Sequence, residues 1–236
     1  MLDRSKSLNT YLKGLSLPSQ VAFAYHPLDY AWDVYEAYVT RFAAGPKKIL
    51  YIGMNPGPFG MAQTGIPFGE IQAVKNFLRL DENFRIHTPK KMHPKKPVQG
   101  WACKRSEVSG KRLWGWLKDR YQTAENCFEN NFILNYCPVL FLTETGCNLT
   151  PNDLPKASLH AILEACDAHL RDWVEHLQVE HVIGVGQFAS QRAEIALSGI
   201  QIHTLLHPSP ANPHANRNPW AETASRQLEA MGLSAL

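Results

Sequence analysis

The chain has 236 residues, of which 44% are hydrophobic and 19% charged, and its formal net charge is +3. This length suits one α/β domain, and the composition is typical of a globular protein. The sequence has no apolar run near the roughly 20 residues that a membrane helix needs. Residues 1–10 lack the apolar core of a secretory signal. We therefore expect an intracellular protein, cytoplasmic if bacterial and nuclear if eukaryotic.

Basic residues are concentrated in segment 85–112. This segment holds nine Lys and Arg residues and one acid, Glu107, so its local charge is +8 and the rest of the chain carries −5. A basic segment on a mildly acidic body indicates a polyanionic partner on one face. A solvated basic loop is the alternative. Five cysteines stand singly without a CxxC pair, which favours reduced thiols over disulfides or an iron–sulfur or zinc site.

Helices and strands are predicted to alternate along the chain, from the spacing of apolar residues and the positions of Gly and Pro. In chain order, we predict a helix over 28–42, a strand over 47–53, a helix over 69–80, a helix over 109–121, a buried strand within 130–141, a helix over 154–178, a strand over 179–186, a helix over 187–199, a strand over 200–206 and a helix over 218–232. Residues 83–108 show no period and are predicted to form an exposed loop.

This order predicts a three-layer α/β fold, with a central, mostly parallel four-stranded sheet flanked by helices. We treat 1–236 as one domain, in which residues 1–25 form an N-terminal extension without a recognised motif. Ligands bind beyond the carboxyl ends of the strands in such sheets. The loops 53–69, 135–149, 184–188 and 207–219 are therefore expected to meet in space.

The loop 53–69 is dense in Gly and Pro and has few polar side chains, among them Asn55. Its spacing matches neither the dinucleotide-binding nor the P-loop motif. Glycines allow a ligand to approach main-chain amides, and Phe59 and Phe68 offer flat apolar faces. We interpret it as a site for a planar, uncharged ligand. A purely structural turn is the alternative.

His207 directly follows the last predicted strand and begins a loop that contains three prolines, 207–216. A histidine there can act as an acid, a base or a hydrogen-bond donor, or it can be structural. The stiff loop beyond it is suited to enter a base stack. Asn135 can pair with the edge of a pyrimidine through its amide, although an Asn at a strand end is more often a turn residue.

Two predicted helix starts are candidate phosphate sites. Segment 103–116 combines four cations with Ser106 and with Ser109, which is predicted to open the helix. An ordinary capped helix is the alternative. In segment 183–191, either the helix N-terminus faces a phosphate, or Gly184 and Gly186 permit close strand–helix packing. The sequence has no HExxH or GxSxG motif. No carboxylate occurs in the two stiff loops before Glu70, so a paired-carboxylate mechanism lacks support.

Together, the segments 53–70, 105–116, 135–138 with 148–155, 183–193 and 207–216 resemble the single-strand-selective monofunctional uracil-DNA glycosylases of the uracil-DNA glycosylase superfamily. The matches follow the family's order and cover about residues 50–220. The resemblance implies a monomeric DNA repair enzyme without metal or cofactor. Such an enzyme flips uracil or 5-hydroxymethyluracil out of single- or double-stranded DNA and hydrolyses the N-glycosidic bond, leaving an abasic site.

The resemblance also implies roles for individual residues. Asn55 matches the residue that positions water, where related enzymes have Asp, and His207 matches the residue that stabilises the leaving base. Phe68 matches the aromatic that stacks on the base, and Asn135 matches the amide that reads the pyrimidine edge. Three further positions correspond to the pocket around the ring and its 5-substituent: Met54, Gly57 and Met61.

DNA contacts are expected from the basic segment, the second helix start and the stiff loop: Lys104, Arg105, Ser106, Ser109, Lys111, Gly186, Pro208, Ser209, Pro210, Ala211 and Asn212. One departure affects the wedge that fills the gap left by a flipped base. Animal members carry a basic residue where this chain has Ala211, and Arg217 or His214 are the candidate substitutes.

Three alternatives stay open at this stage. A mismatch-specific thymine or uracil glycosylase shares the Asn-Pro-Gly run. A non-catalytic nucleic-acid-binding protein can use the same fold, although the presence of both Asn55 and His207 disfavours it. A hydrolase of free nucleosides is disfavoured by the basic segment.

Overall fold

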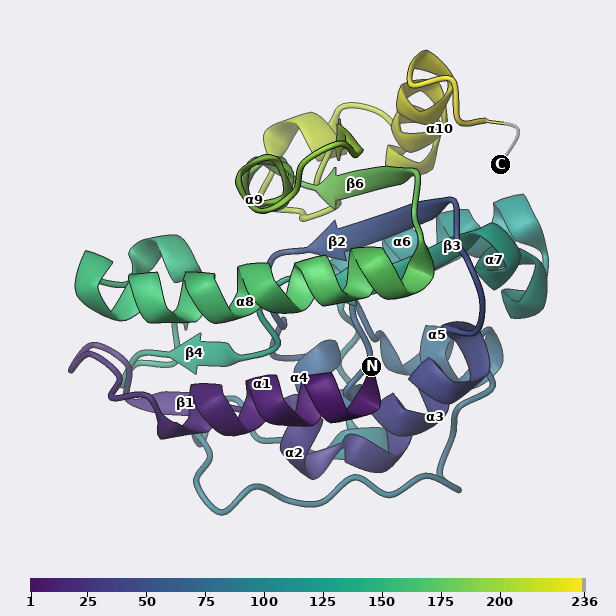
Figure 1. The fold of residues 1–236 in the computed structure, drawn as a ribbon. Coiled ribbons are helices and arrows are strands. Elements are labelled where there is room, and N and C mark those ends of the chain that lie inside the picture. The colour runs from purple at the N-terminus through teal and green to yellow at the C-terminus, as the bar shows by residue number, and fades with distance from the viewer. Residues whose placement is uncertain (235–236) are drawn as a thin grey trace.

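A central sheet of four parallel strands organises the computed structural model, which describes residues 1–234 (Figure 1). The strands lie in the order β3-β2-β6-β7. Their bounds are Ile49–Gly53 for β2, Asn131–Asn135 for β3, His181–Val185 for β6 and Gln201–Leu205 for β7. Every residue of β2 and β3 is buried, as expected for parallel strands covered on both faces.

Helices cover both faces of this sheet, which confirms the predicted three-layer α/β fold (Figure 1). On one face lie α8 (Lys156–Leu177) and α9 (Gln187–Ala196), and the ring of Trp173 stacks on Phe132 of β3 with centroids 4.9 Å apart. On the other face lie α6 (Val108–Tyr121) and α10 (Trp220–Ala230). There Trp116 packs edge-on against Tyr51 of β2.

Gly184 brings β6 and α9 into close contact. A Cβ at this position would lie 2.6 Å from the Cα of Ser190, which is too close for any side chain. The Ser190 hydroxyl also accepts a hydrogen bond from Thr204 of β7 at 2.8 Å. Of the two interpretations of Gly184, strand–helix packing is therefore the one that the structure supports.

A second, antiparallel sheet was not predicted. It consists of β1 (Phe23–Tyr25), β4 (Leu140–Leu142) and β5 (Asn148–Leu149), in the order β1-β4-β5. The prediction of one strand within 130–141 was therefore wrong, because the chain leaves the parallel sheet after Asn135 and joins the other sheet at Leu140. Pro138, which has no N–H for a ladder, lies at this break.

The small sheet also supports the basic segment. Its buried residues form a cluster with Val98 and with Ile86 and Met92. The Tyr25 hydroxyl donates to the carbonyl of Lys96 at 2.8 Å and accepts from the amide of His93 at 2.7 Å. The long irregular stretch between α5 (Ile71–Asn76) and α6 is thus held against the protein by side chains that periodicity does not reveal.

The N-terminal residues form a helix, α1 (Leu2–Gly14), that packs along α8 (Figure 1). The Ser5 hydroxyl lies 3.1 Å from His169 Nε2 and 3.1 Å from the hydroxyl of Tyr35 in α3 (Trp32–Phe42). Trp173 donates to the same His169 nitrogen at 3.2 Å. The segment without a recognised motif is therefore part of the packed structure.

Other helices differ from their predicted bounds. The predicted helix 28–42 is divided into α2 (Pro27–Tyr30) and α3 (Trp32–Phe42), and α7 (Ala124–Asn130) was not predicted. The predicted helix 69–80 is only α5 (Ile71–Asn76), since the chain turns through Arg79, with φ of 54°, to bury Leu78 and Leu80. The short elements are α4 (Met61–Thr64), η1 (Gly100–Ala102), η2 (Pro151–Asp153) and η3 (Pro213–Asn216).

Within the described residues, no helix has both the length and the apolar character needed to cross a bilayer.

Candidate active site

A pocket of about 290 Å³ lies beyond the carboxyl ends of the parallel strands. All seven residues predicted to be catalytic or to bind the base line it: Met54, Asn55, Gly57, Met61, Phe68, Asn135 and His207. They come from the segments that follow β2, β3 and β7. The expectation that these distant loops meet in space is therefore confirmed, and the volume suits a small ligand.

Phe68 and Asn135 form one wall of the pocket, and Gly53 makes their approach possible. A Cβ on Gly53 would lie 2.7 Å from two atoms of the Phe68 ring and closer still to Oδ1 of Asn135. Phe68 has a φ of 53°, and its carbonyl accepts from the indole N–H of Trp114 at 3.1 Å. Asn135 Nδ2 lies 3.1 Å from the sulfur of Met61. Both side chains are buried and held in place by their neighbours.

His207 faces Phe68 across the pocket, with ring centroids 6.2 Å apart. Burial lowers the pKa of His207 below its usual value, so the imidazole is neutral at pH 7. Its Nδ1 accepts a hydrogen bond from the Ser209 amide at 3.1 Å. The ring proton is therefore on Nε2, and His207 can donate a hydrogen bond from that atom.

Gly186, predicted to contact DNA, lies behind His207. It has a φ of 95°, and a Cβ there would lie 3.2 Å from the Cβ of His207. Its amide donates to the carbonyl of Leu205 at 2.8 Å. Gly186 therefore leaves room for the His207 side chain at the end of β7.

Asn55 lines the pocket and carries an unsatisfied amide nitrogen. Its Nδ2 atom is buried and has no hydrogen-bond partner among the described residues. Buried polar atoms in native proteins are nearly always hydrogen-bonded. This unpaired N–H marks Asn55 as a side chain that protein packing alone does not satisfy.

Glu107 also lines the pocket, and its only distinguishing feature in the sequence is its isolation among cations. It is the N-cap of α6 and accepts hydrogen bonds from the amides of Ser109, at 3.2 Å, and Gly110. The prediction that Ser109 opens this helix was wrong, since α6 begins at Val108. The first amides of α6 are thus occupied by a carboxylate. Asn148 of β5 is a second lining residue that was missed.

The stiff loop after β7 is held by α6. Arg112 donates to the carbonyl of Pro208 at 2.9 Å and to Oδ1 of Asn216 at 3.0 Å. Asn216 in turn donates to the carbonyl of Pro210 at 2.7 Å. Pro208 is buried, whereas Pro210 and Ala211 are exposed. The loop is therefore a preformed projection whose tip is free to contact a partner.

Two further bonds fix the shape of this projection. The Ser209 hydroxyl accepts from the amide of Ala211 at 3.2 Å, and Asn212 Oδ1 accepts from the amide of His214 at 3.0 Å. His214 and Arg217 line a separate hollow beside α10.

The predicted phosphate-binding side chains lie near the start of α6. Lys104, Arg105 and Lys111 are exposed. The guanidinium of Arg105 covers the ring of Phe59, 3.8 Å from its centroid, so this Phe59 face is occupied. The Ser106 hydroxyl donates to Glu70 at 2.9 Å. These cations, called the basic rim below, lie close in sequence to Glu107 and Ser109 at the start of α6, which line the pocket.

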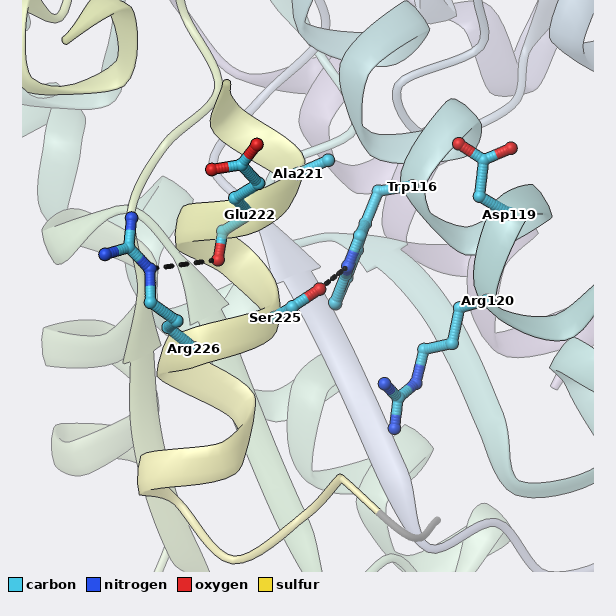
Figure 2. Close-up of a pocket in the computed structure, with 7 residues that line it drawn as sticks. All are labelled: Trp116, Asp119, Arg120, Ala221, Glu222, Ser225 and Arg226. Carbon is cyan, nitrogen blue, oxygen red and sulfur yellow. Dashed lines mark hydrogen bonds between the residues drawn. The ribbon is translucent and has the colours of Figure 1, made fainter. Parts of the chain in front are cut away.

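A larger hollow of about 820 Å³ lies between α6 and α10 (Figure 2). Trp116 donates to the Ser225 hydroxyl there at 3.0 Å. Acidic and basic side chains both line this hollow. It shares no lining residue with the pocket at the strand ends. Size alone would favour this hollow, but the convergence of Asn55, His207 and Asn135 identifies the smaller pocket as the candidate active site.

The five cysteines are unpaired, and among the residues that the structure describes no three His, Cys, Asp or Glu side chains converge as metal ligands do.

Comparison with known proteins identifies the family of the chain. Residues 41–228 match the model of the uracil DNA glycosylase superfamily. The single-strand selective monofunctional uracil-DNA glycosylase of Rattus norvegicus is 45% identical over 98% of this chain and 84% of its own length. The corresponding proteins of Mus musculus and Bos taurus are each 44% identical over 98% of this chain and cover 84% and 86% of their own lengths.

The fold has a counterpart among solved structures. The crystal structure of wild-type SMUG2 from Pedobacter heparinus superposes with a TM-score of 0.67 and 18% sequence identity, covering 97% of this chain and 98% of that one. The chain therefore belongs to the single-strand selective monofunctional uracil-DNA glycosylases, within the uracil DNA glycosylase superfamily.

Proposed function

We propose that this protein is a monofunctional DNA glycosylase of base excision repair, which removes uracil and 5-hydroxymethyluracil from single- and double-stranded DNA. The observation that carries the proposal is the pocket at the strand ends. It brings together four groups suited to a pyrimidine base: the buried ring of Phe68, the amide of Asn135, the neutral imidazole of His207 and the unpaired amide N–H of Asn55. The relatives described above, named as uracil-DNA glycosylases, support the same activity.

DNA binding begins at the basic rim. Lys104, Arg105 and Lys111 contact phosphates without reading sequence. The projection 208–212 enters the base stack, and the target nucleotide rotates outward. Unstacking costs a few kcal/mol and costs least in single strands. The exposed tip at Pro210 and Ala211 is small, so it fills little of the gap left in a duplex.

The flipped base enters between Phe68 and the loop that contains Met54 and Gly57. Phe68 stacks on the ring, and the amide of Asn135 pairs with the polar edge of the base. Because Phe68 and Asn135 are packed against each other at Gly53, both are preorganised before DNA binds. Preorganisation reduces the ordering cost of binding.

Bond cleavage separates charge between sugar and base. As the C1′–N1 bond stretches, the sugar gains oxocarbenium character and the base becomes an anion. His207 donates from Nε2 to the developing charge on O2 of the base, where a fixed donor is worth more than water. Asn55 orients a water molecule onto C1′. The products are an abasic site and the free base.

A single-turnover assay tests this function. The substrate is one labelled strand with a single uracil, used alone and paired so that uracil faces G or A, and alkali reveals abasic sites. We expect alkali-dependent cleavage in all three contexts. Cleavage only opposite G would instead support a mismatch-specific enzyme. Release of uracil from free deoxyuridine would indicate a nucleoside hydrolase, and no cleavage in any context would refute the proposal.

Asn55→Ala tests the water-orienting role. We expect the rate to fall about 100-fold or more, while the affinity for uracil-containing DNA stays near the wild-type value. Asn76→Ala, an exposed amide on α5, is the matched control. An unchanged rate for Asn55→Ala would remove this residue from the mechanism. Borohydride should trap no protein–DNA adduct, because no lysine lines the pocket within the described residues.

A further inference from the structure

The proposed reaction releases a proton that neither Asn55 nor His207 can accept. Water that attacks C1′ must lose a proton as the new C–O bond forms. Asn55 is an amide and has no basic atom. His207 accepts the Ser209 N–H at Nδ1 and carries its own proton on Nε2. In this tautomer the histidine is a donor and cannot also serve as the base.

We propose that the Glu107 carboxylate is the proton acceptor for the attacking water, which Asn55 orients. This inference rests on the proposed glycosylase function. Of the twelve residues that line the pocket, Glu107 is the one carboxylate. In the step, the water oxygen bonds to C1′ and one water proton moves to Glu107. The C1′–N1 electron pair leaves with the base as an anion that His207 stabilises.

The position of Glu107 fits this role. A Cβ on Gly57 would lie 3.8 Å from Oε1 of Glu107, so the carboxylate faces the same loop as Asn55, two residues away. A Cβ on Gly60 would lie 3.0 Å from Cγ of Glu107. These two glycines therefore make room for the glutamate. Sequence reasoning assigned such glycines to ligand contact, whereas here they admit a carboxylate to the pocket.

The hydrogen bonds of Glu107 leave it able to accept a proton. Oε1 accepts from the Ser109 amide at 3.2 Å, and Oε2 accepts from the Gly110 amide. The Ser109 side chain also hydrogen-bonds to the carboxylate. Two oxygens with two lone pairs each therefore retain one further acceptor position. Burial raises the pKa of Glu107 above its usual value, although these bonds oppose the shift. A higher pKa makes the carboxylate a stronger base near neutral pH.

The competing explanation is that Glu107 only caps α6, and Glu70 provides a matched comparison. Glu70 is likewise a buried N-cap, of α5, and accepts from the Ala73 amide and the Ser106 hydroxyl, both at 2.9 Å. It does not line the pocket. Glu107→Gln and Glu70→Gln therefore perturb similar helix caps, but only the first removes a base from the pocket.

The test is the pH dependence of the single-turnover rate on uracil-containing single strands, measured for the wild type and both variants. Melting temperatures and DNA affinities are measured in parallel. The titratable groups that face Glu107 are Glu70 and, across the pocket, His207. We expect the wild-type rate to fall on the acidic side as Glu107 is protonated. Glu107→Gln should lose about 100-fold or more at pH 7.5, and this acidic limb should disappear.

Three outcomes overturn the inference: Glu107→Gln within about threefold of the wild type, a slow variant that keeps the same acidic limb, or an equal loss in Glu70→Gln. If Glu107→Gln does not fold, Glu107→Asp keeps a carboxylate one methylene shorter, and its acidic limb should persist at a reduced rate. Loss of that limb in a folded Glu107→Asp would also contradict the proposal. A wild type inactive on uracil refutes the proposed function itself, and the inference with it.

Discussion

Gly53→Ala is expected to slow the reaction by displacing Phe68 and Asn135, the two side chains that form one wall of the pocket. The new Cβ would lie 2.7 Å from the Phe68 ring, whereas ordinary contacts begin at 3.4 Å, so the ring must move by about 0.7 Å. Asn135 Oδ1 is closer and must move further. Phe68 cannot retreat freely, since the Trp114 indole holds its carbonyl at 3.1 Å. A misplacement near 1 Å can cost about 100-fold in rate.

The assay compares the single-turnover rate and the melting temperature of Gly53→Ala with those of the wild type. We expect a rate loss of about 100-fold, with about 1–3 kcal/mol lost from the free energy of unfolding by overpacking. Gly115→Ala is the matched control. Its Cβ meets nothing within 4 Å in α6, so it should keep the rate and gain up to about 1 kcal/mol from helix propensity. A Gly53→Ala enzyme with wild-type rate and stability would refute this account of the wall.

Three further predictions concern the projection and His169 of α8, which contacts Ser5 of α1. Arg112→Ala should slow turnover because the projection loses its bonds at Pro208 and Asn216. In Arg112→Ala, the slope of the logarithm of the DNA-binding constant against the logarithm of the salt concentration should stay unchanged. In Lys111→Ala this slope should fall by about one. Titrations at several salt concentrations distinguish the two variants. Ala211→Arg should raise the rate on duplexes relative to single strands several-fold, because a longer side chain fills the gap in the stack; an unchanged ratio would mean that the tip is not the wedge. Burial lowers the pKa of His169 to about 4, below its value in the unfolded chain. Its contribution to the free energy of unfolding is therefore fully present above about pH 6.5 and falls on acidification, by about 2 kcal/mol at pH 5. His169→Gln should weaken the dependence of melting temperature on pH, whereas His160→Gln, at an exposed position of α8, should not. Equal slopes of melting temperature against pH in both variants would contradict the role given to His169.

The parallel sheet and its helices could be predicted because their signals are local. The strands around Leu50 and Ile183 are short apolar runs, and α8 and α10 have clear helical periods. The second sheet could not be predicted in this way. Its strands have two or three residues each, and β1 and β4 pair across more than 100 residues of chain. Such pairings are decided by tertiary packing, which overrides local propensity.

The site could be predicted in part for a related reason. Asn55, Asn135 and His207 follow strand ends, and the geometry of parallel sheets brings strand ends together. Glu107 comes from a helix start, inside a segment whose nine cations suggested phosphate binding. Its carboxylate occupies the first amides of α6, which helix-terminus reasoning alone assigns to an external anion. Whether a helix start is already occupied depends on side-chain direction, which sequence does not give.

The order of the strands has a consequence for how the enzyme acquires its activity. β2 pairs with β3 and with β6, so Ile49 has partners 82 and 132 residues away along the chain. Pairings of such long range form late and slowly during folding, because loop closure must precede the contacts that reward it. No contiguous half of the chain contains the complete pocket. Cleavage activity should therefore recover only with the slowest refolding phase, and a nascent chain should remain inactive until the segment that contains His207 has left the ribosome.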